Sequence, residues 1–212
     1  MWATSMPCLI GDPSSIPIAE YGDSNIGRMK HVYRKGLDAR YGRPMQAIAG
    51  MHYNFSMPES FWPEWGSILG RERNGQDFIS EMYMGAIRNC LRNHALILYL
   101  LGASPAVCRS FSPDFGISLD EFDADTLYRP VGTTLRLSEI GYQNDAQSGL
   151  QVSLNTLPEY VRDLDAAVAT SHPPYEKIGV QVNGDYRQLS SSMLQVENEY
   201  YGWARPKRTT RR

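Results

Sequence analysis

The sequence predicts an α+β fold, in which antiparallel strands form a sheet with polar inner faces and helices cover its outside. Residues 46–55 and 193–201 alternate between two kinds of side chain, as half-buried strands do. Residues 77–101 and 157–169 repeat apolar side chains every three or four positions, as amphipathic helices do. The chain has 212 residues, 42% of them hydrophobic, and no linker rich in Ser and Gly, so we expect a single domain over residues 1–212.

Charge and hydropathy argue against several classes of protein. A formal net charge of -2 and a pI near 6.1 disfavour a dedicated nucleic-acid-binding protein, which is usually strongly basic. The longest aliphatic run, residues 95–101, is far short of the roughly 20 residues that a membrane span requires. The amino terminus lacks the basic and apolar regions of a secretory signal. We therefore expect a cytoplasmic protein without nucleic-acid or membrane partners.

Two helices have clear boundaries in the sequence. Residues 24–25 can cap a helix that Gly42 ends, and a capping box at Thr156 and Glu159 predicts a second helix over residues 157–169. The chain before the first helix is rich in Pro, Gly and Ser and is expected to be extended or looped. The first helix has an apolar stripe that should face inward, made of Ile26, Met29, Tyr33 and Leu37.

Residues 46–55 combine a strand pattern with polar side chains. One face of this strand would be apolar, and the other would present Gln46, His52 and Asn54 around Gly50. Two amides and an imidazole beside a glycine are typical of a floor for a polar substrate, and the imidazole could hold a metal. The alternative interpretation is that His52 is an ordinary hydrogen-bonded residue of a half-buried strand.

The next segment joins aromatic residues to the longest helix pattern of the chain. Residues 61–65 predict an aromatic loop, and residues 66–75 predict a surface connection. The helix expected over residues 77–101 has a wide apolar surface, which implies burial against a sheet. Cys90 and His94 lie on that surface and are expected to be core residues.

Two groups of residues invite a metal or redox hypothesis. Cys8, Cys90 and Cys108 are odd in number and lack C-x-x-C spacing, so they indicate neither a disulfide framework nor a zinc site. Residues 111–129 read as a loop. This loop holds an acidic cluster without the signature of a calcium loop, so we interpret it as a solvated turn. Its members are Asp120, Glu121, Asp123 and Asp125.

Three charged residues in otherwise apolar or alternating segments each have two interpretations. Arg136, flanked by leucines, is either paired with a carboxylate of the fold or available to bind a substrate carboxylate bidentately. Glu197 and Glu199 fall on one face of the strand expected over residues 193–201. They could bind a cation or pair with Arg205, Lys207 or Arg208.

Collinear segments along nearly the whole chain resemble the bacterial type of glutamate-cysteine ligase, the first enzyme of glutathione synthesis. The resemblance includes Gly50-Met-His52-Tyr-Asn54-Phe, Thr134-Leu-Arg136-Leu-Ser, Gly141-Tyr142, and Leu194-Gln-Val-Glu197-Asn-Glu199. Other matching segments are residues 21–37, 40–42, 101–108, 175–179 and 205–208. The resemblance implies a ligase fold similar to glutamine synthetase, here incomplete. It also implies ATP-dependent amide formation between L-glutamate and L-cysteine through a γ-glutamyl phosphate, with Mg²⁺ as cofactor and ATP as substrate.

The resemblance also assigns roles to individual side chains. It implies that His52 is a metal ligand and that Gln46 and Asn54 hold glutamate. It places four side chains around the cysteine substrate: Tyr33, Arg136, Tyr142 and Tyr201. It places the basic pair Arg205 and Lys207 beside the nucleotide, although in isolation the basic end of the chain would read as a localisation or nucleic-acid tail.

The resemblance covers only the middle of the family. The acidic metal ligands of the family precede the segments present here, and a further glutamate and a phosphate-binding arginine follow them. We therefore expect a central fragment of a ligase that is inactive without the missing amino- and carboxyl-terminal segments. The alternative is a non-catalytic interaction module or the non-functional product of a truncated gene.

Overall fold

The computed structural model of the chain describes residues 6–50, 52–71, 75–102, 105–111, 118–135 and 145–207. Its α-helices are α1 (Asn25–Tyr41), α2 (Arg43–Gln46), α3 (Phe61–Ile68), α4 (Gln76–Arg92), α5 (His94–Leu101), α6 (Leu157–Ala169) and α7 (Pro173–Ile178). Short 3₁₀ helices are η1 (Pro13–Ser15), η3 (Asp145–Gln147) and η4 (Glu197–Glu199). The strands are β1 (Ala106–Cys108), β2 (Asp120–Glu121), β3 (Thr126–Tyr128), β4 (Gln181–Val182) and β5 (Asp185–Tyr186).

Two small antiparallel sheets accompany the helices, which confirms the α+β class. One sheet has the order β1-β3-β2, with Val107 opposite Leu127. The other is the β4-β5 hairpin, whose turn residues Asn183 and Gly184 both have positive φ angles, as a two-residue hairpin turn requires.

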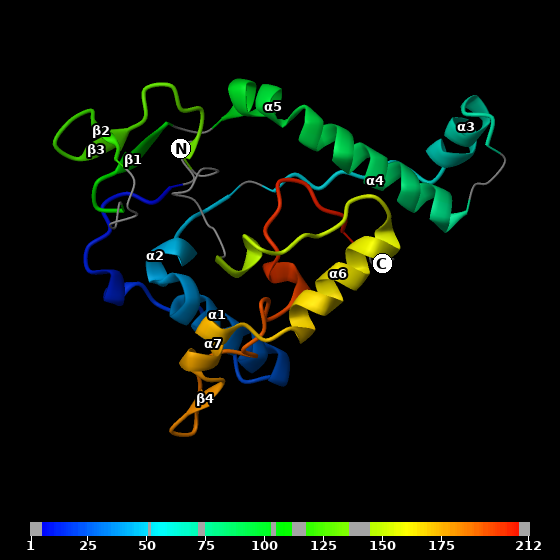
Figure 1. Cartoon of the computed structure of the whole chain (residues 1–212). Coiled ribbons are helices and arrows are strands. Elements are labelled where there is room, and N and C mark those ends of the chain that lie inside the picture. The colour runs from blue at the N-terminus through cyan, green and yellow to red at the C-terminus, as the bar shows by residue number, and fades with distance from the viewer. Residues whose placement is uncertain are drawn as a thin grey trace.

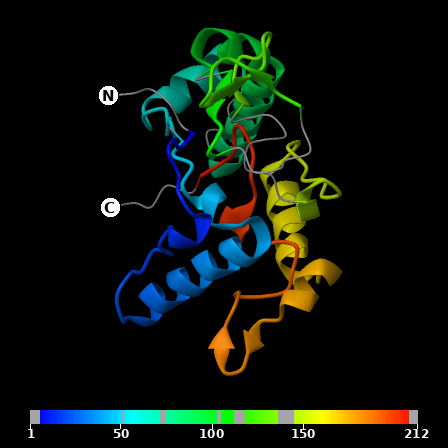
Figure 2. The same ribbon diagram turned by 90° about the vertical axis from the view of Figure 1, so that its left-hand side faces the viewer.

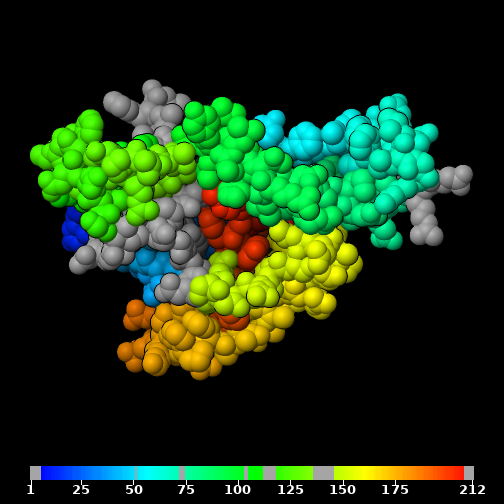
Figure 3. Space-filling model, turned by 45° about the horizontal axis from the view of Figure 1, so that its top comes forward, coloured from blue at the N-terminus to red at the C-terminus, as the bar shows by residue number. Residues whose placement is uncertain are grey.

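The helices lie on opposite sides of the last part of the chain. In Figure 1, α4 and α5 run end to end across the top, with the β1-β3-β2 sheet beyond α5 and α3 beyond the other end. Helices α1, α6 and α7 lie below them, and Figure 2 shows the same division from the side. Residues 189–207, which we call the final segment, pass between these groups. Figure 3 shows this segment flanked by α4, α5 and α6. This segment therefore connects the two sides.

Two clusters of buried side chains form the core. One joins Met6, Val107, Phe111 and Leu135. The other joins Met84 of α4, Tyr160, Leu164 and Ala167 of α6, and Leu194. The expected packing of the long helix against a sheet is therefore wrong, because α4 packs against α6 and the final segment instead.

The two helices with clear sequence boundaries are confirmed. The Ser24 side chain accepts the Gly27 N–H, and Gly42 follows α1 with a φ of 81°. The Thr156 side chain accepts the Glu159 N–H at the start of α6. The inward stripe predicted for α1 is only half right. Leu37 is buried, whereas Ile26 and Met29 are 65% and 48% exposed because the described chain covers mainly the carboxyl-terminal half of the helix.

The single helix predicted over residues 77–101 is two helices. The Asn93 side chain donates to the Asn89 carbonyl at 2.8 Å, a local bond that competes with the helical pattern and ends α4. Cys90 and His94 are exposed, so their assignment to the core is wrong. The ring of His94 lies 5.5 Å from that of Trp203 instead.

The strand predicted over residues 46–55 is also wrong. Gly42 and Pro44 start a second helical turn, α2, because proline is well suited to the first turn of a helix. The described residues from Ala47 to Met57 are extended or turned and pair with no other strand. Their far end is fixed where the Met57 N–H donates to the Tyr83 hydroxyl at 2.8 Å.

Three further segments differ from expectation. Residues 61–65 belong to α3, whose Trp62 packs edge-on against Phe78 and Tyr83 of α4. The loop expected over residues 111–129 contains the β2-β3 hairpin. Residues 193–201 form no strand, and Glu197–Glu199 are a 3₁₀ helix instead. Leu194 and Gln195 are both buried, so the burial does not alternate as it would in a half-buried strand.

Candidate functional site

A buried ion pair joins α1 to the final segment of the chain. Arg40 Nη1 lies 3.1 Å from Glu199 Oε1, and both side chains are 0% exposed. Arg40 also donates to Gln188 Oε1 at 3.0 Å and to the Ser190 carbonyl at 2.7 Å. The ring centroid of Tyr175 lies 4.0 Å from the guanidinium. Helix α1, α7 and the final segment thus meet at one arginine.

The carboxylate of Glu199 is satisfied on both oxygens. The Tyr41 hydroxyl donates to Oε1 at 2.8 Å, and the Gln195 backbone N–H donates to Oε2 at 2.6 Å. A buried charge is tolerated only when it is paired and hydrogen-bonded, and Glu199 meets both conditions. Glu199 therefore pairs with a basic side chain, as one sequence interpretation held, but its partner is Arg40 and neither Arg205 nor Lys207. Arg208 lies outside the described residues. Glu197 is exposed.

Gln195 fastens the same segment to the middle of α1. Its Oε1 accepts the Leu189 N–H at 2.9 Å, and its Nε2 donates to the Tyr33 carbonyl at 3.4 Å. Gly36 makes this approach feasible, because a Cβ at that position would lie 2.1 Å from Gln195 Oε1. We refer to Arg40, Gln188, Gln195 and Glu199 as the buried polar network.

We expect Gly36→Ala to lower the free energy of unfolding by about 1–3 kcal/mol, the usual cost of overpacking a filled interior. Gly85→Ala in α4 is the matched control, because its added Cβ would meet only the end of Arg88 at 3.7 Å. That change should stabilise the chain by about 0.5–1 kcal/mol through helix propensity. Urea unfolding followed by tryptophan fluorescence measures both values. Equal effects of the two alanines would show that Gly36 has no packing role.

Tyr33 lies beside this network on α1. Burial raises the pKa of its phenol to about 12, and the negative charge of Glu199 contributes to the same shift. The hydroxyl is therefore protonated at neutral pH and remains able to donate a hydrogen bond. Gln46 lies next to the same part of α1, because its Nε2 donates to the carbonyl of Arg34 at 3.2 Å.

The other end of the final segment carries two more predicted site residues. The Tyr201 N–H donates to Gln147 Oε1 at 2.9 Å. Arg205 Nη1 donates to the carbonyls of Asn198 and Tyr200, at 3.1 and 2.8 Å, which fixes one edge of its guanidinium. The structure thus attaches Tyr33, Gln46, Tyr201 and Arg205 to one framework made of α1 and the final segment.

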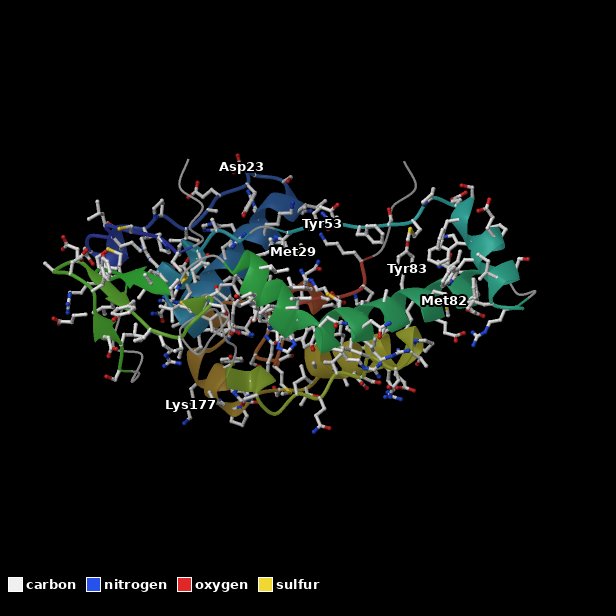
Figure 4. The ribbon with its side chains drawn as sticks, turned by 90° about the horizontal axis from the view of Figure 1, so that it is seen from above. Asp23, Met29, Tyr53, Met82, Tyr83 and Lys177 are labelled. Atoms are coloured by element: carbon white, nitrogen blue, oxygen red, sulfur yellow. The ribbon has the colours of Figure 1, made fainter. Side chains whose placement is uncertain are left out.

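Three other predicted site residues are exposed and lie away from this framework. His52 and Asn54 are exposed on the extended stretch between α2 and α3, where Figure 4 labels their neighbour Tyr53. Lys207 is exposed as well. Arg136 and Tyr142 lie outside the described residues.

The acidic cluster of the β2-β3 hairpin has structural partners. Glu121 forms an ion pair with Arg109 at 2.9 Å, and Asp123 accepts the Asp125 N–H at 2.9 Å. Within the described ranges, no group of three or more His, Cys, Asp or Glu side chains is placed to hold a metal ion. Of the helices that the structure describes, none combines the length and apolar character of a membrane span.

Sequence reasoning missed the buried polar network. One local signal was present, because Tyr33, Gly36, Leu37 and Arg40 follow the three- and four-residue spacing of one helix face. That spacing places Arg40 on the inward side. The partner of Arg40 is 159 residues away, and no local pattern identifies it.

Comparisons with known proteins give one family over nearly the whole chain. The family model described as glutamate-cysteine ligase matches residues 1–212. The glutamate-cysteine ligase of Pseudomonas putida (strain W619) is 51% identical over 210 residues, which cover 99% of this chain and 40% of that protein. The corresponding ligase of Alcanivorax borkumensis is 51% identical over 214 residues, covering 99% and 41%. The chain therefore spans about 40% of the length of the curated relatives that it matches.

A solved structure matches over the same extent. The crystal structure of glutamate-cysteine ligase from Francisella tularensis in complex with AMP superposes with a TM-score of 0.87 at 36% sequence identity. The match covers 99% of this chain and 41% of that one. The helices and small sheets described above are thus arranged as in part of a larger ligase fold.

Proposed function

Since the chain belongs to the glutamate-cysteine ligase family, we propose that residues 1–212 form the central part of a catalytic domain that joins L-glutamate to L-cysteine in the first step of glutathione synthesis. The observation that carries this proposal is the 51% identity to the Pseudomonas putida ligase along 99% of the chain. We propose a cytoplasmic location for this reaction.

The proposed reaction has two steps. The γ-carboxylate of glutamate attacks the terminal phosphorus of ATP, which releases ADP and forms a γ-glutamyl phosphate. The amine of cysteine then attacks the acyl carbon, phosphate leaves, and the nitrogen loses a proton to give the amide. Both steps concentrate negative charge, so the site must supply cationic and hydrogen-bonding groups that face the reacting oxygens.

The framework of α1 and the final segment supports a substrate role for its attached residues. Tyr33 is protonated and half-buried, and Gln46 is held by α1. We assign Gln46 and Asn54 to glutamate. We assign Tyr33, Arg136, Tyr142 and Tyr201 to the cysteine pocket. In this assignment the buried polar network positions Tyr33 and Tyr201 and does not itself touch substrate.

Arg205 and Lys207 are the proposed nucleotide contacts. Arg205 Nη1 donates to two backbone carbonyls, and Nε and Nη2 have no partner among the described residues. Those donors have the fork geometry that binds phosphate. The Francisella ligase, whose structure contains AMP, supports a nucleotide site in this fold.

Magnesium does not fit the described residues by themselves. Mg²⁺ prefers oxygen ligands in octahedral geometry, and the described part of the chain groups no set of carboxylates around His52. We therefore derive no step of the reaction through the metal. We propose only that His52 contributes one ligand, with carboxylates from the rest of a full-length ligase completing the site.

A chimeric ligase tests the function. In it, residues 1–212 replace the matching 40% of the Pseudomonas putida enzyme. We expect formation of γ-glutamylcysteine and ADP that requires both amino acids. The control is a chimera that carries the matching segment of the Alcanivorax borkumensis ligase. It shows whether the Pseudomonas putida enzyme stays active when this segment is replaced by that of a relative. An active control beside a folded but inactive test chimera would favour the alternative of a non-catalytic module.

In the chimeric ligase, His52→Ala is expected to raise the magnesium concentration that gives half-maximal activity. Titration of Mn²⁺ by electron paramagnetic resonance should show weaker metal binding in the same variant, without reference to turnover. Tyr53→Ala is the matched control, because this neighbour is also exposed and a phenol is not a usual ligand of Mg²⁺. Unchanged metal dependence and unchanged Mn²⁺ binding would refute the assignment of His52.

Arg136→Lys in the chimeric ligase tests the cysteine pocket. Lysine keeps the charge but loses the bidentate fork, so substrate binding should weaken by about 1.5–3 kcal/mol, the range for hydrogen bonds to charged groups. The Michaelis constant for cysteine should rise while that for ATP stays unchanged. Michaelis constants for both amino acids equal to those of the parent chimera would mean that Arg136 has a structural role.

A further inference from the structure

The amino-terminal segment crosses the end of β1 next to a pair of cysteines. The Ile10 N–H donates to the Ser110 hydroxyl at 3.0 Å, and Cys108 Sγ lies 3.2 Å from the same hydroxyl. Met6 packs with Val107 in the buried cluster on the other side of this crossing. Figure 1 shows the segment running beside the β1-β3-β2 sheet. The segment is thus held on both sides of residue 8.

This crossing brings the thiols of Cys8 and Cys108 together. Both are free thiols, Cys8 being exposed and Cys108 half-buried. Leu9, between Cys8 and Ile10, has a φ of 54°, a left-handed conformation that is uncommon for a leucine.

The surroundings favour the thiolate of Cys108. Burial by itself raises the pKa of this thiol, but hydrogen bonds from the Leu9 backbone, the Ser110 hydroxyl and the Cys8 thiol lower it to about 7. The pKa of Cys8 is raised, first by its hydrogen bond to Cys108 and further by burial and by the charge of Asp125. The sulfur of Cys108 therefore favours the reactive thiolate, and Cys8 stays a protonated neighbour.

We propose that Cys8 and Cys108 form a reversible thiol oxidation site, in which the pair is converted to an intramolecular disulfide by exchange with a small-molecule disulfide. The proposal is independent of the ligase function, because it depends only on the contact between these two segments. The sequence pattern did not indicate it, since the two cysteines are 100 positions apart.

The oxidation takes place by two successive thiol–disulfide exchanges. The Cys108 thiolate attacks one sulfur of the small-molecule disulfide, the S–S bond breaks, and one small thiolate leaves. Cys8 then loses its proton and attacks the Cys108 sulfur, and the second small thiolate leaves. Two protein thiols are oxidised to one disulfide, and one small-molecule disulfide is reduced to two thiols.

The disulfide would tie the amino-terminal segment to β1. The cluster behind this contact includes Leu135, which directly precedes Arg136 in the chain. Because the bridge would close a long loop, it should strongly reduce the conformational entropy of the unfolded chain. We expect the oxidised chain to unfold at a temperature at least about 5 °C above that of the reduced chain.

The test uses chain 1–212 incubated with oxidised glutathione at pH 7.5, followed by alkylation and peptide mapping by mass spectrometry. We expect the bridge between Cys8 and Cys108, and the same bridge in the Cys90→Ser variant. Cys8→Ser should instead trap a mixed disulfide on Cys108. In 8 M urea the outcome should differ, because loop-closure entropy favours the shorter bridge between Cys90 and Cys108 about tenfold.

Two results would overturn the proposal. One is a native chain that gives the same bridges as the chain in urea, because the fold would then not select the pair. The other concerns reactivity toward iodoacetamide at pH 7.0. Cys108 should react several-fold faster than the more exposed Cys90, and an equal or slower rate would show that the surroundings do not activate it.

Discussion

Arg40→Ala is expected to lower the free energy of unfolding by about 3–5 kcal/mol, the usual cost of removing one partner of a buried ion pair. The variant leaves the Glu199 carboxylate at 0% exposure without its countercharge. It also removes the donors to Gln188 and to the Ser190 carbonyl, so three segments lose their common contact. Urea unfolding of the variant and the parent chain measures the difference.

A surface ion pair is the matched control. Arg71 and Glu81 lie 2.7 Å apart, but their side chains are 49% and 53% exposed. Solvent screens such a pair, so Arg71→Ala should cost less than about 1 kcal/mol. If Arg40→Ala costs no more than Arg71→Ala, the final segment is not held by the buried pair. The double variant Arg40→Met/Glu199→Met should recover part of the loss, because it leaves no unpaired charge.

Helix boundaries were predictable because their causes are local. The Ser24 cap, the Gly42 stop and the Thr156 cap each act within a few residues, and both α1 and α6 begin and end where these signals place them. The break between α4 and α5 has a local cause too, in the Asn93 side chain. The apolar pattern continues through it, so periodicity alone joined the two helices.

The predicted strands failed for a different reason. Alternation indicates a strand only when a neighbouring strand is available, and pairing is a long-range event. In the described structure, the stretch after α2 has no such neighbour. The segment around Glu199 is instead shaped by side chains that bond to α1, so Leu194 and Gln195 are buried together.

The candidate site was predicted only in part. Spacing along α1 predicted that Tyr33 faces inward, and the structure half-buries this residue and bonds its carbonyl to Gln195. No spacing rule connects Arg40 with Glu199, whose pairing depends on how the chain returns to α1 after 159 residues. For His52 and Asn54, the structure neither buries nor pairs the side chains, and their roles stay predictions.

A large apolar surface remains exposed in the described structure. No residue of α5, which is described in full, is buried. The exposed fractions are 58% for Leu96, 78% for Tyr99, 65% for Leu100 and 78% for Leu101. Monomeric proteins rarely expose so contiguous an apolar surface without a partner. The curated relatives are about two and a half times as long as this chain, so their additional length offers the simplest cover for this helix.

Chain 1–212 purified alone is therefore expected to form no γ-glutamylcysteine, whereas the chimeric ligase should form it. A phosphoryl-transfer site needs a metal held by several carboxylates, and the described residues assemble no such group. The assay measures phosphate release with ATP, Mg²⁺, glutamate and cysteine. A dye that fluoresces on apolar surface should bind the isolated chain more strongly than the chimera, because we expect the additional segments of the chimera to cover α5.

Two controls make the comparison decisive. The chimera carrying Arg136→Lys should keep its low dye binding while its affinity for cysteine falls, which separates coverage of α5 from the chemistry of the pocket. The isolated chain with Cys90→Ser should behave as the parent chain, because Cys90 is exposed and has no assigned role. Turnover by the isolated chain within about tenfold of the chimera, a difference of only about 1.4 kcal/mol in activation free energy, would contradict the prediction. The metal ligands would then have to be sought within residues 1–212, beginning with Glu197, which is exposed and lies outside the Arg40 pair.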